Sequence, residues 1–268
     1  MESKMFKSYL QYPFNNILHD YPDCHASSLI TQLVEKWQQA IIAFYVPENN
    51  SNKNFISVGS GFLLKNNGFH SIITANHVMD ELINKECYFS LNNIFFPLGK
   101  VIYKKSDSHD YAAIMPPKAL MCSEGNYIAF SNELSKNHEP TMSMIVSGFP
   151  SNKNKYNPDK SERNAQLYSI LFNSFEFDSN REDIYFNFDS RKKMIRTEMF
   201  EPLSFGKSLP SLAGMSGGPV MQILKNKSTD ALTLRVVGVF KEHHRQKGKY
   251  LVAGAFINFS EEIKALYN

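Results

Sequence analysis

Short apolar runs separated by polar turns occupy most of the chain from residue 40 onwards. The runs are rich in β-branched and aromatic residues, and segments such as NNSNKN and KNNG separate them. This alternation is typical of β-strands joined by turns. The runs read AIIAFYV, FISVGSGFLL, FHSIITANHV, CYFSLNN, IFFPLGKVIY, MSMIVSGFP, LYSILFNSFEF, IYFNF, PVMQIL, TLRVVGVF and YLVAGAFINF. About a dozen short strands with few helices predict an all-β barrel or sandwich.

Two short segments have helical spacing instead. In SLITQLVEKW, Leu29, Leu33 and Trp37 lie four residues apart, which places them on one face of a helix. Near the end of the sequence, Ser260 is a good N-cap and acidic residues fill the turn after it. The residues before the first of these helices are expected to form a loosely ordered arm.

A polar segment at residues 131–140, which ends in proline, divides the strands into two sets of similar length. We therefore expect an N-terminal arm and helix over residues 1–37, a first β-barrel over 38–135, and a second β-barrel with the C-terminal helix over 136–268. The longest polar loop, residues 151–165, falls within the second set and is too hydrophilic to belong to a core.

Composition and charge exclude several classes of protein. Of 268 residues 43% are hydrophobic, which is enough to bury a sizeable core and excludes general disorder. The net charge is only +3, far from the basic excess of a nucleic-acid-binding protein. The longest apolar run, residues 40–46, is much shorter than the roughly 20 residues of a membrane-spanning helix. We expect neither nucleic acid nor a membrane as a partner.

The sequence also favours a cytoplasmic location without a bound metal or cofactor. Residues 1–16 lack the apolar segment of a secretory signal. The three cysteines include no CxxC pair, which fits a reducing compartment. His109, His243 and His244 do not have the spacing of metal ligands, because adjacent residues of a strand point to opposite faces. We therefore predict no metal site and no cofactor.

The segment GMSGGPV, residues 214–220, carries the strongest chemical signal in the chain. Its three glycines would weaken a strand and therefore imply a tight turn. Such a turn exposes backbone N–H groups beside the hydroxyl of Ser216, which is the geometry needed to hold a developing oxyanion. Taken alone, the motif is also compatible with an ordinary glycine-rich turn that carries a surface serine.

A serine nucleophile needs a base, and the base needs an orienting carboxylate. His77 follows the apolar run SIITA, and Asp110 directly precedes the run YAAIM. Both residues therefore lie at the boundary of a predicted strand, where a polar side chain can face a groove. Asp107 and Asp80 are rival carboxylates. However, no apolar strand follows Asp107 directly, and Asp80 fits better as a solvated acid at the start of a helix.

These segments resemble the trypsin-like, chymotrypsin-fold serine peptidases, in their bacterial stand-alone form. ITANHV is similar to the family's histidine box, DYAAI to its aspartate box and GMSGGPV to its serine box, in the family's order. GSGFLL, VSGFP and VVGVF extend the similarity, which spans roughly residues 40–259. The resemblance implies two six-stranded antiparallel β-barrels with short N- and C-terminal helices.

By this resemblance Ser216 is the nucleophile, His77 is the general base and Asp110 holds the imidazole in its working orientation. The N–H groups of Gly214 and Ser216 form the oxyanion hole. Met215 stands where digestive members have an aspartate that pairs with a newly cut N-terminus, so that activation latch is absent here.

The resemblance also indicates where the substrate side chain before the cleaved bond is bound. The residues expected to form this pocket are Leu209, Pro210 and Ser211 at its floor and Lys241, Glu242 and His243 at its border. The floor carries no aspartate, so a preference for lysine or arginine is not supported. We expect a polar, partly hydrophobic pocket.

The function implied is that of a serine endopeptidase that hydrolyses protein substrates through an acyl-enzyme intermediate. A peptidase made in a cytosol needs restraint, so we expect a regulatory partner or self-assembly through residues 1–37. Two alternatives stay open at this point. One is a protease-like binding module that holds a peptide without cutting it, and the other is a self-processing protease released from a longer precursor.

Overall fold

The structure is a computed structural model that describes most of the chain between residues 14 and 256. The described residues are 14–18, 33–34, 37–48, 51–66, 68–83, 85–91, 94–99, 101–106, 109–121, 127–130, 134–157, 162–163, 166–188, 195–198, 211–244 and 249–256.

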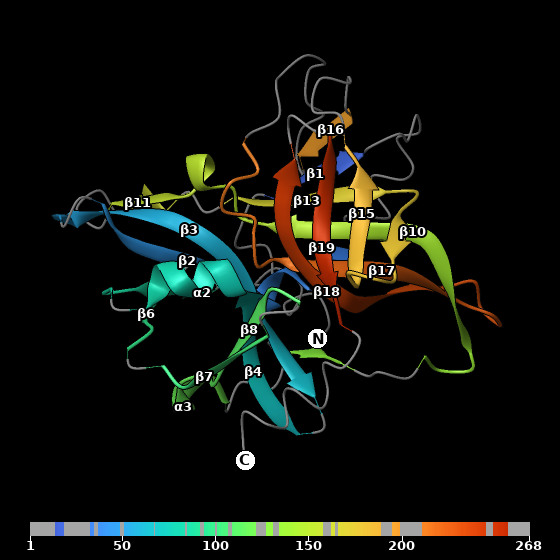
Figure 1. Cartoon of the computed structure of the whole chain (residues 1–268), viewed down its shortest axis with the longest axis horizontal. Coiled ribbons are helices and arrows are strands. Elements are labelled where there is room, and N and C mark those ends of the chain that lie inside the picture. The colour runs from blue at the N-terminus through green and yellow to red at the C-terminus, as the bar shows by residue number, and fades with distance from the viewer. Residues whose placement is uncertain are drawn as a thin grey trace, which may run out of the picture.

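The first of two sheets contains ten strands and most of the blue to green ribbon in Figure 1. Its main path runs β6-β5-β2-β3-β4-β8-β7, and three short strands, β9, β11 and β12, extend it. The strands are β2 (Ile41–Glu48), β3 (Ser51–Asn66), β4 (Phe69–Ala75), β5 (Tyr88–Leu91), β6 (Ile94–Pro97), β7 (Tyr103–Ser106), β8 (Tyr111–Ile114), β9 (Ile128–Ala129), β11 (Lys155–Asn157) and β12 (Glu162–Arg163).

The second sheet contains nine strands in the order β14-β15-β19-β18-β17-β10-β13-β1-β16. Except for β1, these strands lie in the yellow-green to red part of Figure 1, which also contains β11 of the first sheet. The strands are β1 (Phe14–Leu18), β10 (His138–Gly148), β13 (Leu167–Phe172), β14 (Glu176–Asp178), β15 (Asp183–Asn187), β16 (Ile195–Glu198), β17 (Pro219–Asn226), β18 (Leu232–His244) and β19 (Tyr250–Ala255). Neighbouring strands are antiparallel except for the parallel pairs β1/β13 and β3/β9.

Helical structure in the described part of the chain is limited to short segments. The named elements are α2 (Asn76–Leu82), α3 (Lys118–Met121) and the 3-10 turns η3 (Gln38–Ala40) and η5 (Ser151–Lys153). The expectation of an all-β fold with two antiparallel sheets is therefore confirmed. The predicted C-terminal helix lies outside the described residues, and so does most of the predicted N-terminal helix, of which Leu33 and Val34 are helical.

Both sheets have more strands than the six that the resemblance implied. Several of the additional strands are very short: β9 and β12 have two residues each, and β11 and β14 have three. An alternation of apolar and polar residues needs at least four positions to be recognisable. The sequence pattern therefore could not reveal these pieces.

Each sheet also contains strands from the other half of the chain. Strand β1 comes from the region expected to be a loose arm, yet it pairs with β13 and β16 in the second sheet. Strand β11 follows the long strand β10 of the second sheet, yet it pairs with β3 of the first. The sequence predicted neither pairing, and the division into three units along the sequence stays a prediction.

Aromatic side chains fill the interior of both sheets. The largest fully buried side chains are all phenylalanines: Phe44, Phe62, Phe89, Phe149, Phe172, Phe186, Phe188 and Phe240. One apolar cluster centres on the first sheet and includes Ile145 and Val239 of the second, and the other belongs to the second sheet alone. The apolar contact between the sheets therefore holds β4 of the first sheet close to β18 of the second.

Candidate active site

His77 and Asp110 meet at the edge of the first sheet. Strand β4 ends at Ala75, helix α2 begins at Asn76, and the neighbouring strand β8 begins at Tyr111. Because β4 and β8 pair with Ala75 opposite Tyr111, the residues that flank this pair are brought together. His77 Nδ1 lies 3.0 Å from Asp110 Oδ2.

This contact fixes the protonation pattern of the imidazole. An ionised carboxylate only accepts hydrogen bonds, so Nδ1 of His77 carries the proton that it donates to Asp110. Nε2 is then left with its lone pair free to accept a proton. The side chain of His77 is 50% exposed and that of Asp110 27%, so the imidazole is accessible to a substrate while its partner is more shielded.

Asp110 is held by its backbone as well as by its side chain. Its Oδ1 accepts a hydrogen bond from the backbone N–H of His77 at 3.2 Å, and its carbonyl accepts one from Asn76 N at 3.1 Å. The first of these satisfies an N–H group in the first turn of α2, whose own N-cap side chain makes no such bond. Asp110 has φ +51°, a left-handed conformation that Asp tolerates better than most residues.

Ser216 lies in the tight turn that the glycines predicted. Gly214 and Gly217 both have positive φ, +89° and +88°. A Cβ on Gly217 would lie 2.1 Å from Ser60 O and 2.9 Å from Ala75 N. Only a residue without a side chain fits between these backbones. The serine turn is therefore packed against β4, two residues before His77.

Ser60 ties the same turn to the first sheet. Its hydroxyl donates to Gly214 O at 2.7 Å and accepts from Phe149 N at 2.8 Å, and its backbone N–H donates to Ser216 O at 2.7 Å. Its side chain is completely buried. The segment GSGFLL resembled the family pattern but indicated no role for Ser60, because a serine between glycines in a strand gives no sign of such distant partners.

The two predicted oxyanion-hole donors are oriented by their neighbouring carbonyls. Ala213 O accepts from Ser151 N at 2.7 Å, and Met215 O accepts from Gly218 N at 3.0 Å. In a trans peptide the C=O and N–H point in opposite directions, so the N–H groups of Gly214 and Ser216 point away from these contacts. Within the described part of the chain, neither N–H group has an acceptor.

The Ser216 hydroxyl is not hydrogen-bonded to His77. Its Oγ donates to the backbone carbonyl of Lys241 at 2.7 Å, its single partner among the residues that the structure describes. Side chains such as serine change rotamer on the picosecond to nanosecond timescale. The structure thus brings Asp110 and His77 into contact and holds the serine turn beside them, with the Ser216 side chain in a rotamer that points to Lys241 O.

Of the residues predicted to form the substrate pocket, some lie outside the described part of the chain and others have partners within it. Leu209 and Pro210 lie outside the described residues, and the Ser211 hydroxyl accepts a long hydrogen bond from Ala213 N at 3.4 Å. Lys241 directs its ammonium to Asp183 at 2.7 Å, and both side chains are nearly buried. The structure therefore places the charge of Lys241 in an internal ion pair.

The two other border residues also have partners within the chain. Glu242 Oε1 contacts His244 Nε2 at 2.7 Å, and the ring of His243 packs edge-on against Phe188 with centroids 5.1 Å apart. Their assignment to the substrate pocket stays a prediction.

Of the rival carboxylates, Asp107 lies outside the described residues and Asp80 faces elsewhere. Asp80 pairs with Lys105 and is 58% exposed. In the part of the chain that the structure describes, no group of three His, Cys, Asp or Glu side chains is arranged to hold a metal ion. Nor does that part contain a helix of the length and apolarity needed to cross a bilayer.

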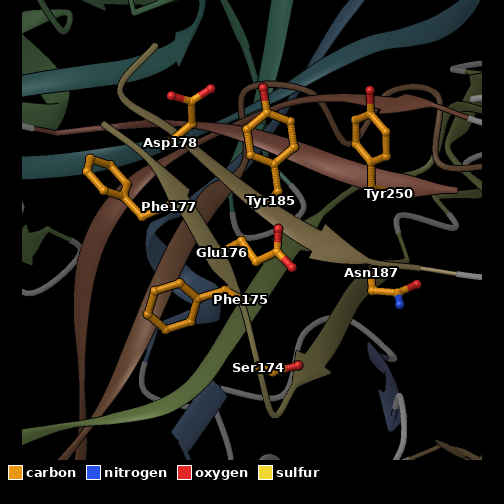
Figure 2. Close-up of a pocket in the computed structure, with 8 residues that line it drawn as sticks. All are labelled: Ser174, Phe175, Glu176, Phe177, Asp178, Tyr185, Asn187 and Tyr250. Carbon is orange, nitrogen blue, oxygen red and sulfur yellow. The ribbon is translucent and has the colours of Figure 1, made fainter. Parts of the chain in front are cut away.

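A cavity of about 660 Å³ lies over β14, β15 and β19. Figure 2 shows its aromatic and acidic lining, in which the rings of Tyr185 and Tyr250 stand 5.4 Å apart. The lining residues are Ser174, Phe175, Glu176, Phe177, Asp178, Tyr185, Asn187 and Tyr250. The predicted catalytic residues are not among them.

No family model and no curated protein matches this chain. Solved structures do match it in fold. The serine endoprotease from Yersinia pestis aligns with a TM-score of 0.52 and 12% identity over 92% of this chain and 68% of that chain. The protease Anisep from Arthrobacter nicotinovorans aligns with a TM-score of 0.50 and 12% identity over 86% and 96%. The chain has the chymotrypsin-type serine protease fold.

A catalytically inactive tobacco etch virus protease complexed with substrate is also similar, with a TM-score of 0.44 and 11% identity over 85% of this chain and 83% of that chain. At identities this low, a shared chymotrypsin-type fold says nothing by itself about activity. The chemistry of the site therefore depends on the contacts of this chain's own residues.

Proposed function

We propose that this protein is a serine endopeptidase that hydrolyses peptide bonds in protein substrates through an acyl-enzyme intermediate. The observation that supports it most directly is the His77–Asp110 contact at 3.0 Å, beside a serine turn whose two oriented N–H groups have no acceptor among the described residues. Acyl transfer requires these three parts: a nucleophile, an oriented base and an oxyanion site.

The first chemical step begins with rotation of the Ser216 side chain from Lys241 O towards His77. Oγ then attacks the carbonyl carbon of the substrate while Nε2 of His77 accepts the hydroxyl proton. Asp110 stabilises the imidazolium that forms. The negative charge moves to the substrate oxygen, where the N–H groups of Gly214 and Ser216 bind it.

The tetrahedral intermediate collapses when the bond to the leaving amine breaks. His77 returns its proton to the amine nitrogen, which leaves an ester between the substrate acyl group and Ser216. Water then attacks the ester, again with His77 as base, and releases the acid and the free serine. In the proposed mechanism the chain's own residues carry every proton transfer.

A peptide-binding module without turnover is the second candidate, and one observation favours it: the Ser216 hydroxyl is bonded to Lys241 O rather than to His77. A fluorophosphonate probe separates the two, because it forms a covalent bond only with an activated serine. We expect mass spectrometry to find the adduct on Ser216 in the wild type and not in Ser216→Ala or His77→Ala. A folded wild type without adduct, with no turnover of a peptide library, would exclude the peptidase.

We further propose that activity is restrained in the cytoplasm by a partner or by self-assembly through the N-terminal region. The test must spare β1, because residues 14–18 are part of the second sheet. Deletion of residues 1–13 should therefore alter activity or the mass measured by light scattering. A variant with unchanged activity and mass would refute a regulatory contact through residues 1–13.

A further inference from the structure

A second histidine, His109, lies directly beside Asp110 in the sequence, and nothing in the proposed mechanism uses it. His109 precedes Asp110 in the turn between β7 and β8, and only 7% of its surface is exposed. Ser106 Oγ lies 3.1 Å from its Nδ1, and Glu182 contacts its Nε2. Because a carboxylate only accepts, Nε2 carries the proton donated to Glu182. A histidine thus joins two loops that are distant in the sequence.

Glu182 belongs to the second sheet, at the turn between β14 and β15. Its φ is +55°, so the residue is held in a left-handed conformation, and its carbonyl accepts from Ala255 N at 3.0 Å. The next residue, Asp183, binds the ammonium of Lys241 at 2.7 Å. The turn is therefore fixed to β19 and to β18 as well as to His109.

The backbone of His109 rests on the second sheet too. A Cβ on Gly254 would lie 2.2 Å from His109 O, so the glycine allows the β7–β8 turn to approach β19 closely. His109 is therefore held at two points. Its ring contacts the carboxylate of Glu182, and its carbonyl packs against Gly254. Because Asp110 is the next residue, fixing His109 also restricts the position of Asp110, which has a left-handed φ of +51°.

We infer that Glu182 is a positioning residue that acts through His109 to keep the Asp110 carboxylate in line with His77. It touches neither substrate nor a reacting atom. A left-handed backbone conformation is strained in residues other than glycine, so the Asp110 conformation needs support from its neighbours. On the side of the first sheet, Asn76 and His77 donate hydrogen bonds to Asp110. On the side of the second sheet, Glu182 accepts a hydrogen bond from His109, the residue before Asp110.

This inference rests on the proposed function, and its test separates the two. The rate at which a fluorophosphonate labels Ser216 is measured for wild type and variants, together with kcat, KM and the melting temperature. We expect Glu182→Ala and Glu182→Asp to label about ten- to a hundredfold more slowly, with kcat lowered and KM unchanged. Aspartate tolerates the positive φ but is too short to reach His109. Glu182→Gln should label nearly as fast as wild type, since its amide oxygen still accepts from Nε2.

A matched control is available at another hairpin of the same sheet. Asp230 also has φ +55°, and it pairs with Lys225 at 2.8 Å on the exposed β17–β18 turn. Asp230→Ala should label at the wild-type rate. If Glu182→Ala and Glu182→Asp label as fast as Asp230→Ala, Glu182 has no positioning role and the inference is overturned.

A second measurement needs no activity at all. In a Ser216→Ala background, ¹⁵N shifts of the His77 ring report its tautomer. We expect the Nδ1–H form, and a mixture with the Nε2–H form when Glu182 is replaced by Ala or Asp. An unchanged tautomer would overturn the inference even if the wild type were active. A wild type that no probe labels, but whose tautomer depends on Glu182, would remove the proposed function and keep the positioning role.

Discussion

The carboxylate of Asp110 receives two hydrogen bonds from His77, one from the backbone N–H at 3.2 Å and one from ring Nδ1 at 3.0 Å. The first binds the carboxylate to the start of helix α2, and the second sets the imidazole tautomer. Asp110 therefore both caps the helix and orients the imidazole that the helix carries. The geometry of this pair decides which ring nitrogen of His77 keeps a free lone pair.

Replacement of Asp110 by Asn tests that relationship. Asn tolerates φ +51°, so the fold should be kept and the melting temperature should change little. The amide can donate to Nδ1, which favours the wrong tautomer. We expect kcat to fall by a factor of about 10⁴, as in comparable triads. The control is Asp80→Asn, which affects an exposed ion pair with Lys105. Equal rates for both variants would show that Asp110 does not orient the base.

Gly217→Ala should destabilise the protein more than its backbone conformation explains. Gly217 and Gly68 have nearly the same φ, +88° and +87°, so the strain of about 1–2 kcal/mol is common to both substitutions. A Cβ on Gly217 meets Ser60 O, whereas one on Gly68 meets nothing within 4 Å. Urea unfolding of the two variants should therefore give a lower free energy of unfolding for Gly217→Ala. Similar values would contradict the close packing of the serine turn on β4.

Ser60→Ala should weaken the oxyanion site without touching a catalytic residue. The change removes the donor to Gly214 O and the acceptor of Phe149 N–H, both buried. Unsatisfied buried groups cost about 1–3 kcal/mol each, and the free energy of unfolding should fall by that order. Since Gly214 is then less well held, fluorophosphonate labelling should slow. Ser228→Ala, at an exposed turn, is the control that should change neither quantity.

The thiol of Cys87 should be unreactive in the folded protein. Burial raises its pKa, and the neighbouring carboxylate of Glu86 raises it further, because both disfavour the thiolate. At pH 8 the thiolate fraction is therefore smaller in the folded than in the unfolded chain. Iodoacetamide followed by peptide mapping should modify Cys87 only slowly until urea is added. Rapid modification in native buffer would show that this side chain is accessible.

Much of the site was predictable because its chemistry is local in the sequence. The glycines around Ser216 indicated a tight turn, and the apolar runs before His77 and after Asp110 placed both residues at strand ends. The all-β fold followed from the same alternation of apolar runs and polar turns. Local sequence patterns predict where strands end, and the end of a strand determines where the next side chain lies. These positions could therefore be predicted from the sequence alone.

Only the tertiary structure showed which other side chains hold the serine turn and the turn that carries Asp110 in place. Ser60, His109 and Glu182 lie in three different segments, and each has partners far away in the sequence. Pairing of such distant residues depends on how two sheets pack, which no local pattern encodes. The same holds for Lys241, whose ammonium binds Asp183 while its carbonyl holds the Ser216 hydroxyl. Sequence thus predicted the candidate reacting groups and the strands that carry them, and packing determined how those groups are held.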